Sequence, residues 1–248
     1  METLDYIFSP ASPARPFPLF QAPHLTALGI ILVLNLFLVW WGRTHPENRP
    51  LIRTLLAGMI ALNIIAWHLW HLTYGLWIIQ YMLPLHLCGI MQWASFFLLT
   101  TRNPRIYEFV YFLGLGGATQ ALLTPDSGNL GFPHFRALET MISHGSIVTA
   151  ALYFTFVEGY RPTWDSVKHV IVGTQLYAIA VFCLNFLLGS NYMFLARKPD
   201  VPSLIDALGP WPLYIIPLEL IAFATVFLLY LPWAIKERQQ VRAVRVGG

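Results

Sequence analysis

The chain alternates long apolar runs with short polar connections. A helix that crosses a bilayer core of about 30 Å takes about 20 apolar residues. Seven runs approach this length, at residues 22–41, 53–74, 77–100, 107–124, 137–157, 168–189 and 212–234. The pattern predicts an all-α polytopic integral membrane protein, in which residues 1–248 form one bundle of seven transmembrane helices.

Composition and charge agree with this prediction. Of 248 residues, 56% are hydrophobic and 11% are charged, whereas soluble domains carry about 25% charged residues. The connections between the runs alternate between the two sides of the membrane, and 11 of the 15 Lys and Arg residues fall on one side. Basic residues are held on the cytoplasmic side. We therefore expect the N-terminus outside and the C-terminus in the cytoplasm. The net charge of +3 reflects this topology and does not indicate a nucleic-acid partner.

Polar residues gather in the outer half of the predicted bundle. Ionisable groups inside a membrane are costly and usually face a cavity with a function. Five of the eight histidines map to this half, namely His68, His71, His86, His134 and His144. The outward loops and helix mouths add Asp126, Arg136, Asn191, Tyr192 and Lys198. The distribution predicts an outward-facing polar cavity, although His68 and His71 are also explained by the tendency of amphipathic rings to collect at interfaces.

The segment "QYMLPLHLCGIMQW", residues 80–93, contains the most unusual polar pattern. Residues three and four apart share a helix face, so a continuous helix places Tyr81, Pro84, Cys88, Gln92 and Ser95 on one polar stripe. His86 falls on an apolar stripe. Cys88 is then the residue that points to the cavity, unless Pro84 breaks the helix.

Two readings of the cysteines remain open at this point. A cysteine in a membrane helix is most often a small hydrophobic residue, and Cys183 within "AVFCLNF" is an example of this inert kind. Both cysteines map to the outer half of the bundle, so a disulfide between Cys88 and Cys183 also stays open.

Four motifs carry a resemblance to a known family. "LPLHLCGI", "GATQALLTPD", "GFPHFRALETMISHG" and "NYMFLARKP", with the length and the seven runs, resemble the YwaF-like family of conserved bacterial integral membrane proteins. That likeness implies a multi-pass protein of the bacterial plasma membrane. A more distant likeness is to vertebrate transmembrane protein 164, described as a cysteine-centred acyltransferase that moves acyl chains between phospholipids and lysophospholipids. This resemblance implies a catalytic pair, Cys88 and His144.

The implied chemistry is plausible for these residue types. A thiol in apolar surroundings is a weak nucleophile, and a histidine that accepts its proton is a recurring remedy. Gln92, Gln120 and His86 are candidate hydrogen-bond donors for the oxyanion, and Lys198, Arg136 and His134 are candidates to hold a lipid phosphate. The acyl group would pass to a lysophospholipid hydroxyl or to water, and no cofactor is expected.

Two other classes of function are considered. In a zinc-dependent lipid hydrolase, His68 and His71, spaced i, i+3, would bind the metal with His144 or His134. Against this reading, no HxxxH pair is present and no carboxylate is expected inside a span at matching depth. A transporter or ligand-binding protein is the non-enzymatic alternative, although the two halves of the chain share no clear repeat. The sequence leaves open the acyl donor, the acceptor and the oligomeric state.

Overall fold

All regular elements in the part of the chain that the structure describes are helices. The computed structural model describes residues 2–199 and 204–246. The longer helices are α2 (Ala22–Thr44), α3 (Arg49–Thr73), α5 (Leu87–Thr101), α8 (Phe135–Phe156), α9 (Trp164–Leu188) and α10 (Ile215–Val246). Shorter elements are α1 (Glu2–Phe8), η1 (Pro46–Asn48), α4 (Ile79–Met82), η3 (Tyr192–Phe194) and η4 (Leu204–Leu208). A continuous helical stretch combines α6 (Pro104–Phe109), the π-helical turn η2 (Val110–Gly114) and α7 (Leu115–Leu123).

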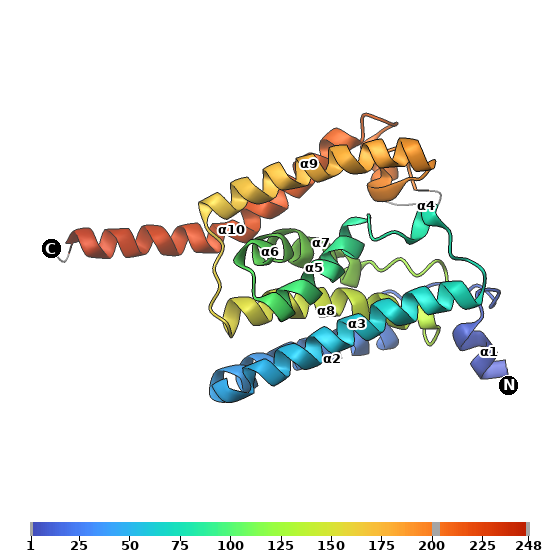
Figure 1. The fold of residues 1–248 in the computed structure, drawn as a ribbon, viewed down its shortest axis with the longest axis horizontal. Helices are drawn as coiled ribbons and strands as arrows, with labels where there is room; N and C mark the ends of the chain where they lie inside the picture. Colours follow the sequence, from blue (N-terminus) through green and yellow to red (C-terminus); the bar gives the residue numbers. More distant parts are fainter. Residues whose placement is uncertain (1, 200–203, 247–248) are drawn as a thin grey trace.

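Helix α8 lies at the centre of one half of the bundle. Figure 1 shows α2 and α3 on one side of the molecule and α9 and α10 on the other, with α5, α6 and α7 between them. Helix α8 contacts α2, α3, α5 and α7. Small residues such as Ala150 and Ala151 are fully buried along it, and small residues let membrane helices approach closely. Polar side chains on α8 therefore face neighbouring helices.

Five helical segments are long and apolar enough to cross a membrane, counting the described residues alone. They are Ala22–Thr44, Pro46–Thr73, Pro104–Leu123, Trp164–Leu188 and Ile215–Gln240. Large apolar side chains such as Phe186, 86% exposed, cover their outer surfaces, as expected where lipid replaces water as solvent. The protein is thus an all-helical integral membrane protein. Helix α5 has 15 residues and is shorter than a span, and α8 carries Arg136, Glu139 and His144 among its apolar residues.

The continuous helix expected at residues 77–100 is broken in the structure. Helix α4 is a single turn, and α5 begins at Leu87 after extended backbone at Leu83 and His86. The break lies at Pro84, whose ring excludes helical backbone at the preceding residue and which has no N–H to donate. Cys88 therefore lies in the first turn of a helix, rather than in the middle of one.

Tyrosines from the other end of the chain bind the backbone groups that this break frees. The hydroxyl of Tyr192 accepts the N–H of Leu83 at 3.0 Å and donates to the carbonyl of Ile79. The hydroxyl of Tyr177 donates to the carbonyl of Leu85 at 3.0 Å. Inside a membrane, irregular backbone is tolerated where protein groups satisfy it. These contacts fix the segment that leads into Cys88.

Candidate functional site

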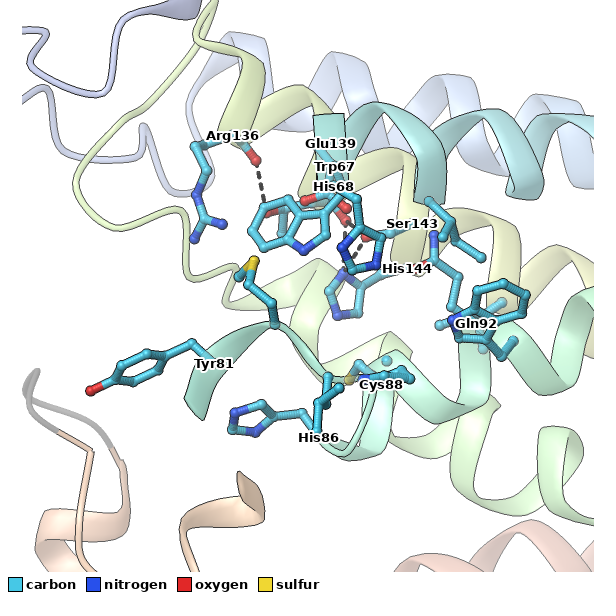
Figure 2. Close-up of a pocket in the computed structure, with 18 of the residues that line it drawn as sticks. Trp67, His68, Tyr81, His86, Cys88, Gln92, Arg136, Glu139, Ser143 and His144 are labelled. Atoms are coloured by element: carbon cyan, nitrogen blue, oxygen red, sulfur yellow. Dashed lines mark hydrogen bonds between the residues drawn. The ribbon is translucent and has the colours of Figure 1, made fainter. Parts of the chain in front are cut away.

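A cavity of about 220 Å³ lies between α3, the start of α5 and α8. Its wall contains seven residues that the sequence pattern singled out for the site: His68, His86, Cys88, Gln92, Asp126, Arg136 and His144. Figure 2 shows most of these side chains around the cavity. His86 and Cys88 both line it because the broken helix no longer separates them onto opposite faces.

Cys88 is half-buried and occupies the second position of α5. The first N–H groups of a helix have no partner within that helix. His86, at the N-cap position, provides no side-chain cap, and only its carbonyl joins the first turn, accepting the N–H of Ile90 at 3.0 Å. The N–H groups of this first turn, which include those of Cys88 and Gly89, therefore lie at the positive end of the helix dipole.

Gly89 allows the chain to fold tightly at this point. A Cβ atom added to Gly89 would lie 3.2 Å from the Cα atom of Pro84 and 3.4 Å from its carbonyl carbon. Those distances are shorter than ordinary van der Waals contacts to a Cβ. The glycine thus permits the close approach that sets where α5 begins.

The imidazole of His144 is oriented by the backbone of its own helix. Its Nδ1 atom lies 2.7 Å from the carbonyl oxygen of Thr140 and 3.2 Å from the hydroxyl of Ser143. Because a carbonyl only accepts, Nδ1 carries the hydrogen in this bond and Nε2 keeps its lone pair. Figure 2 shows the ring extending from α8 toward the start of α5, where Cys88 lies. His144 is thus set up to accept a proton inside the cavity.

The other two cavity histidines have the opposite tautomer. Nδ1 of His86 accepts the N–H of Met193 at 3.2 Å, and Nδ1 of His68 accepts the indole N–H of Trp77 at 3.1 Å. In Figure 2 the ring of His86 points away from Cys88, and it packs on Tyr192 and Phe194. In His68 and His86 the lone pair on Nδ1 is therefore already used. Of the three cavity histidines, His144 is the one whose lone pair is on Nε2 and stays free.

The histidines do not converge as the zinc reading requires. His71 lies against Trp67 and Trp70, with ring centroids 4.1 and 4.8 Å away, and its Nδ1 donates to the carbonyl of Trp67. It is absent from the cavity wall that His68 and His144 share. Among the described residues, no three His, Cys, Asp or Glu side chains are grouped to hold a metal ion. The side chains of His68, His71 and His144 therefore do not lie together as a zinc site requires.

A group of charged residues occupies one end of the cavity wall. Arg136 and Glu139 come from the first turns of α8, and Asp126 comes from the loop before it. The Asp126 carboxylate accepts the N–H of Gly128 at 2.9 Å, which holds that loop. The guanidinium of Arg136 lies 4.5 Å from the ring centroid of Trp67. Glu139 corrects the expectation that no carboxylate would accompany the histidines, because it lies in the apolar run predicted at residues 137–157 and lines the same cavity as His68 and His144.

Gln92 is fixed by a partner on α3. Its amide nitrogen donates to the side-chain oxygen of Asn63 at 2.5 Å. Asn63 is buried in the middle of α3, so this bond ties α3 to α5 one turn beyond Cys88. Gln92 lines the cavity, whereas the other glutamine expected there, Gln120, is exposed on α7.

Four further expected residues form structural contacts outside the cavity wall. His134 caps α8, because Nδ1 accepts the N–H of Arg136 and Nε2 donates to the carbonyl of Ser9, both at 3.1 Å. The side-chain oxygen of Asn191 accepts the N–H groups of Ala196 and Arg197. Tyr192 binds the broken segment before α5, as described above. The ammonium of Lys198 lies 3.6 Å from the carboxylate of Asp206.

Both cysteines are free thiols. Cys88 is half-buried in the cavity wall, and Cys183 is exposed on the surface of α9. The structure therefore contains no Cys88–Cys183 disulfide. The exposure of Cys183 on a helix with candidate-span character agrees with the inert reading of that residue.

Several cavity residues were not found from the sequence. They are Trp67, Glu139, Thr140 and Ser143. Glu139 and Ser143 are spaced i, i+4 in "LETMISH", so an ionisable residue within a predicted span was an available signal. Thr140 contributes its backbone carbonyl, which binds Nδ1 of His144, and the type of side chain does not predict a backbone contact.

Comparison with known proteins gives one positive result. A model of the TMEM164 family matches residues 19–230. Neither the curated proteins nor the solved structures yield a match. The matched range contains the cavity, with Cys88 and His144, and most of the helical bundle. The chain belongs to the TMEM164 family.

Proposed function

We propose that the protein is a membrane-embedded phospholipid/lysophospholipid acyltransferase, or an acyl hydrolase when water is the acceptor, with Cys88 as nucleophile and His144 as general base. One observation carries the proposal: a thiol in the first turn of α5 and an imidazole with a free Nε2 line the same cavity. A histidine that accepts a thiol proton is the recurring way to activate cysteine. Family membership and the apolar helices agree with a membrane protein.

The first half-reaction transfers the acyl group to Cys88. Nε2 of His144 takes the thiol proton, and the thiolate attacks the carbonyl carbon of the lipid ester. The N–H groups of the first turn of α5 donate to the oxyanion, in the manner of preorganised donors in acyl transfer. The carbon–oxygen ester bond then breaks, the lysolipid alkoxide takes the proton from His144, and an acyl-cysteine thioester remains.

The second half-reaction restores the thiol. A hydroxyl of a lysophospholipid, or a water molecule, gives its proton to His144 and attacks the thioester carbonyl. The carbon–sulfur bond breaks, and the Cys88 thiolate takes the proton back from His144. The cycle needs no metal or other cofactor. The acceptor decides whether the product is a new phospholipid or a free fatty acid.

The membrane placement that accompanies this proposal has seven membrane-embedded segments, with the N-terminus outside. Beyond the five apolar helices, the additional segments are α8 and the stretch of α4 and α5. The distribution of Lys and Arg supports this orientation, and the resemblance to bacterial proteins supports the plasma membrane of a bacterium. In this placement, the cavity opens toward the outer half of the bilayer.

Intact-mass measurement of the purified protein after incubation with phospholipid tests the proposal. The expected result is an added fatty-acyl mass that hydroxylamine removes. Cys88→Ala should abolish the adduct and the acyl transfer, while the matched variant Cys183→Ala should retain both, because Cys183 is exposed on α9. Transfer activity that persists in folded Cys88→Ala protein would refute the proposal.

A further inference from the structure

The guanidinium of Arg136 is held against an aromatic ring at the wall of the cavity. Its central carbon lies 4.5 Å from the ring centroid of Trp67, a distance typical of a cation–π contact. Figure 2 shows the guanidinium on the side of the indole that faces Tyr81, away from Glu139. The side chain thus packs on Trp67, and both residues line the cavity.

No acceptor within the described residues binds this guanidinium. Glu139 and Asp126 act on it through space, but neither forms an ion pair with it within 4.0 Å in that part of the chain. Arg carries five N–H donors in a rigid fork that suits phosphate and carboxylate oxygens. Withdrawing such a group from water without an acceptor is costly. The guanidinium is therefore available to bind an oxygen of a ligand.

The other cationic candidates for a phosphate are occupied elsewhere. Both ring nitrogens of His134 bond to protein groups, and Lys198 lies beside Asp206. No other Arg or Lys is among the described residues that line the cavity. An anionic group that enters the cavity will therefore meet Arg136.

We propose that Arg136, supported by Trp67, binds the phosphodiester of the lipid substrate. This inference rests on the proposed function, because it assigns the head-group end of the same cavity. Arg136 and His144 are two turns apart on α8, so a lipid with its phosphate at Arg136 extends its ester toward Cys88. Arg136 supplies a single positive charge and the acidic Glu139 and Asp126 act on it, so doubly charged inorganic phosphate is repelled more strongly than a singly charged phosphodiester.

A binding experiment on protein that cannot turn over separates this inference from the catalytic proposal. Cys88→Ala protein would be titrated with a short-chain phosphodiester lipid, with the matched diacylglycerol that lacks phosphate, and with inorganic phosphate. Adding Arg136→Gln should weaken binding of the phosphodiester about ten- to a hundredfold, the range for losing charge-assisted hydrogen bonds. Diacylglycerol binding should change less than twofold, and Lys198→Gln should leave all three affinities unchanged.

Two further variants keep the test decisive. Arg136→Lys retains the positive charge without the planar fork, so it should lose only part of the affinity for the phosphodiester. Partial binding by this variant would show that the loss in Arg136→Gln does not come from a folding defect. Trp67→Phe keeps a ring and should lose less than Arg136→Gln. Equal phosphodiester binding with and without Arg136 would overturn the inference, as would tighter binding of inorganic phosphate than of the phosphodiester. Acyl transfer by Cys88→Ala protein would overturn the catalytic proposal and leave the binding result standing.

Discussion

The Nδ1 atom of His144 lies 2.7 Å from the carbonyl oxygen of Thr140, one turn earlier in α8. This bond uses a backbone group that no substitution at position 140 removes, so the tautomer of His144 is set by the helix itself. The unprotonated Nε2 that results is the feature on which the proposed base catalysis at Cys88 depends.

Replacing His144 by Gln should slow formation of the acyl-cysteine by about a hundred- to ten-thousandfold, the usual range for losing a general base. The amide has similar hydrogen-bonding capacity but does not take a proton at neutral pH. His86→Gln is the matched control, because that ring points away from Cys88 and accepts one backbone N–H. Time-resolved intact mass gives the rate, and an equal loss in both variants would contradict the role of His144.

Gly89→Ala should reduce the acylation rate several-fold. The added Cβ atom would lie 3.2 Å from backbone of Pro84, so the start of α5 must shift by a few tenths of an ångström, and displacements of about 1 Å at a reacting group cost about a hundredfold. Gly58→Ala is the control, because nothing lies within 4 Å of a Cβ added there. The same acylation measurement checks both variants. An unchanged rate in Gly89→Ala would show that the close packing on Pro84 does not position Cys88.

The apolar periodicity predicted the all-helical membrane architecture, because long runs without charge have few alternatives to a helix in lipid. Five of these runs meet the criteria for a span as single helical segments. The sequence did not predict the interruption at Pro84, although it offered the possibility. A proline inside a long apolar run permits either a kink or a complete break, and the break here depends on Tyr177 and Tyr192, about a hundred residues later.

The candidate site could be predicted in part. The sequence and the family resemblance singled out Cys88 and His144, and the structure places both in one cavity wall, while their catalytic roles stay predictions. The sequence could not show that His134, Asn191 and Lys198 make structural contacts. A side chain that caps a helix or holds a loop uses the same atoms as one that binds a ligand. Trp67 and Glu139 were missed because their orientation depends on how α3 and α8 face each other.

His134→Ala should destabilise the fold by about 1 kcal/mol, the usual effect of losing an N-cap, without changing lipid binding. The ring accepts the N–H of Arg136 and donates to Ser9, and both contacts disappear in the variant. His134→Asn should recover most of the loss, because Asn is a preferred N-cap residue. Denaturant unfolding measures the first effect, and titration with a phosphodiester lipid measures the second. Weaker lipid binding by a fully stable His134→Asn protein would assign the ring to the ligand instead.

Glu158→Gln should destabilise the end of the bundle opposite the cavity. The carboxylate is 3% exposed and lies 2.5 Å from Arg53 and 3.2 Å from Arg102, and so connects α3, α5 and the chain after α8. Removing one partner of a buried ion pair leaves the other charge without compensation, at a cost of roughly 3 kcal/mol at the lower end of the usual range. The lower end applies because Arg102 is 53% exposed and keeps its water. Arg102→Gln should accordingly cost less than Arg53→Gln.

Unfolding midpoints of the three variants test this order. Acyl transfer per folded molecule should stay unchanged, because Glu158 is absent from the cavity wall. A larger loss for Arg102→Gln than for Arg53→Gln would show that the exposed arginine, and not the buried one, holds the carboxylate.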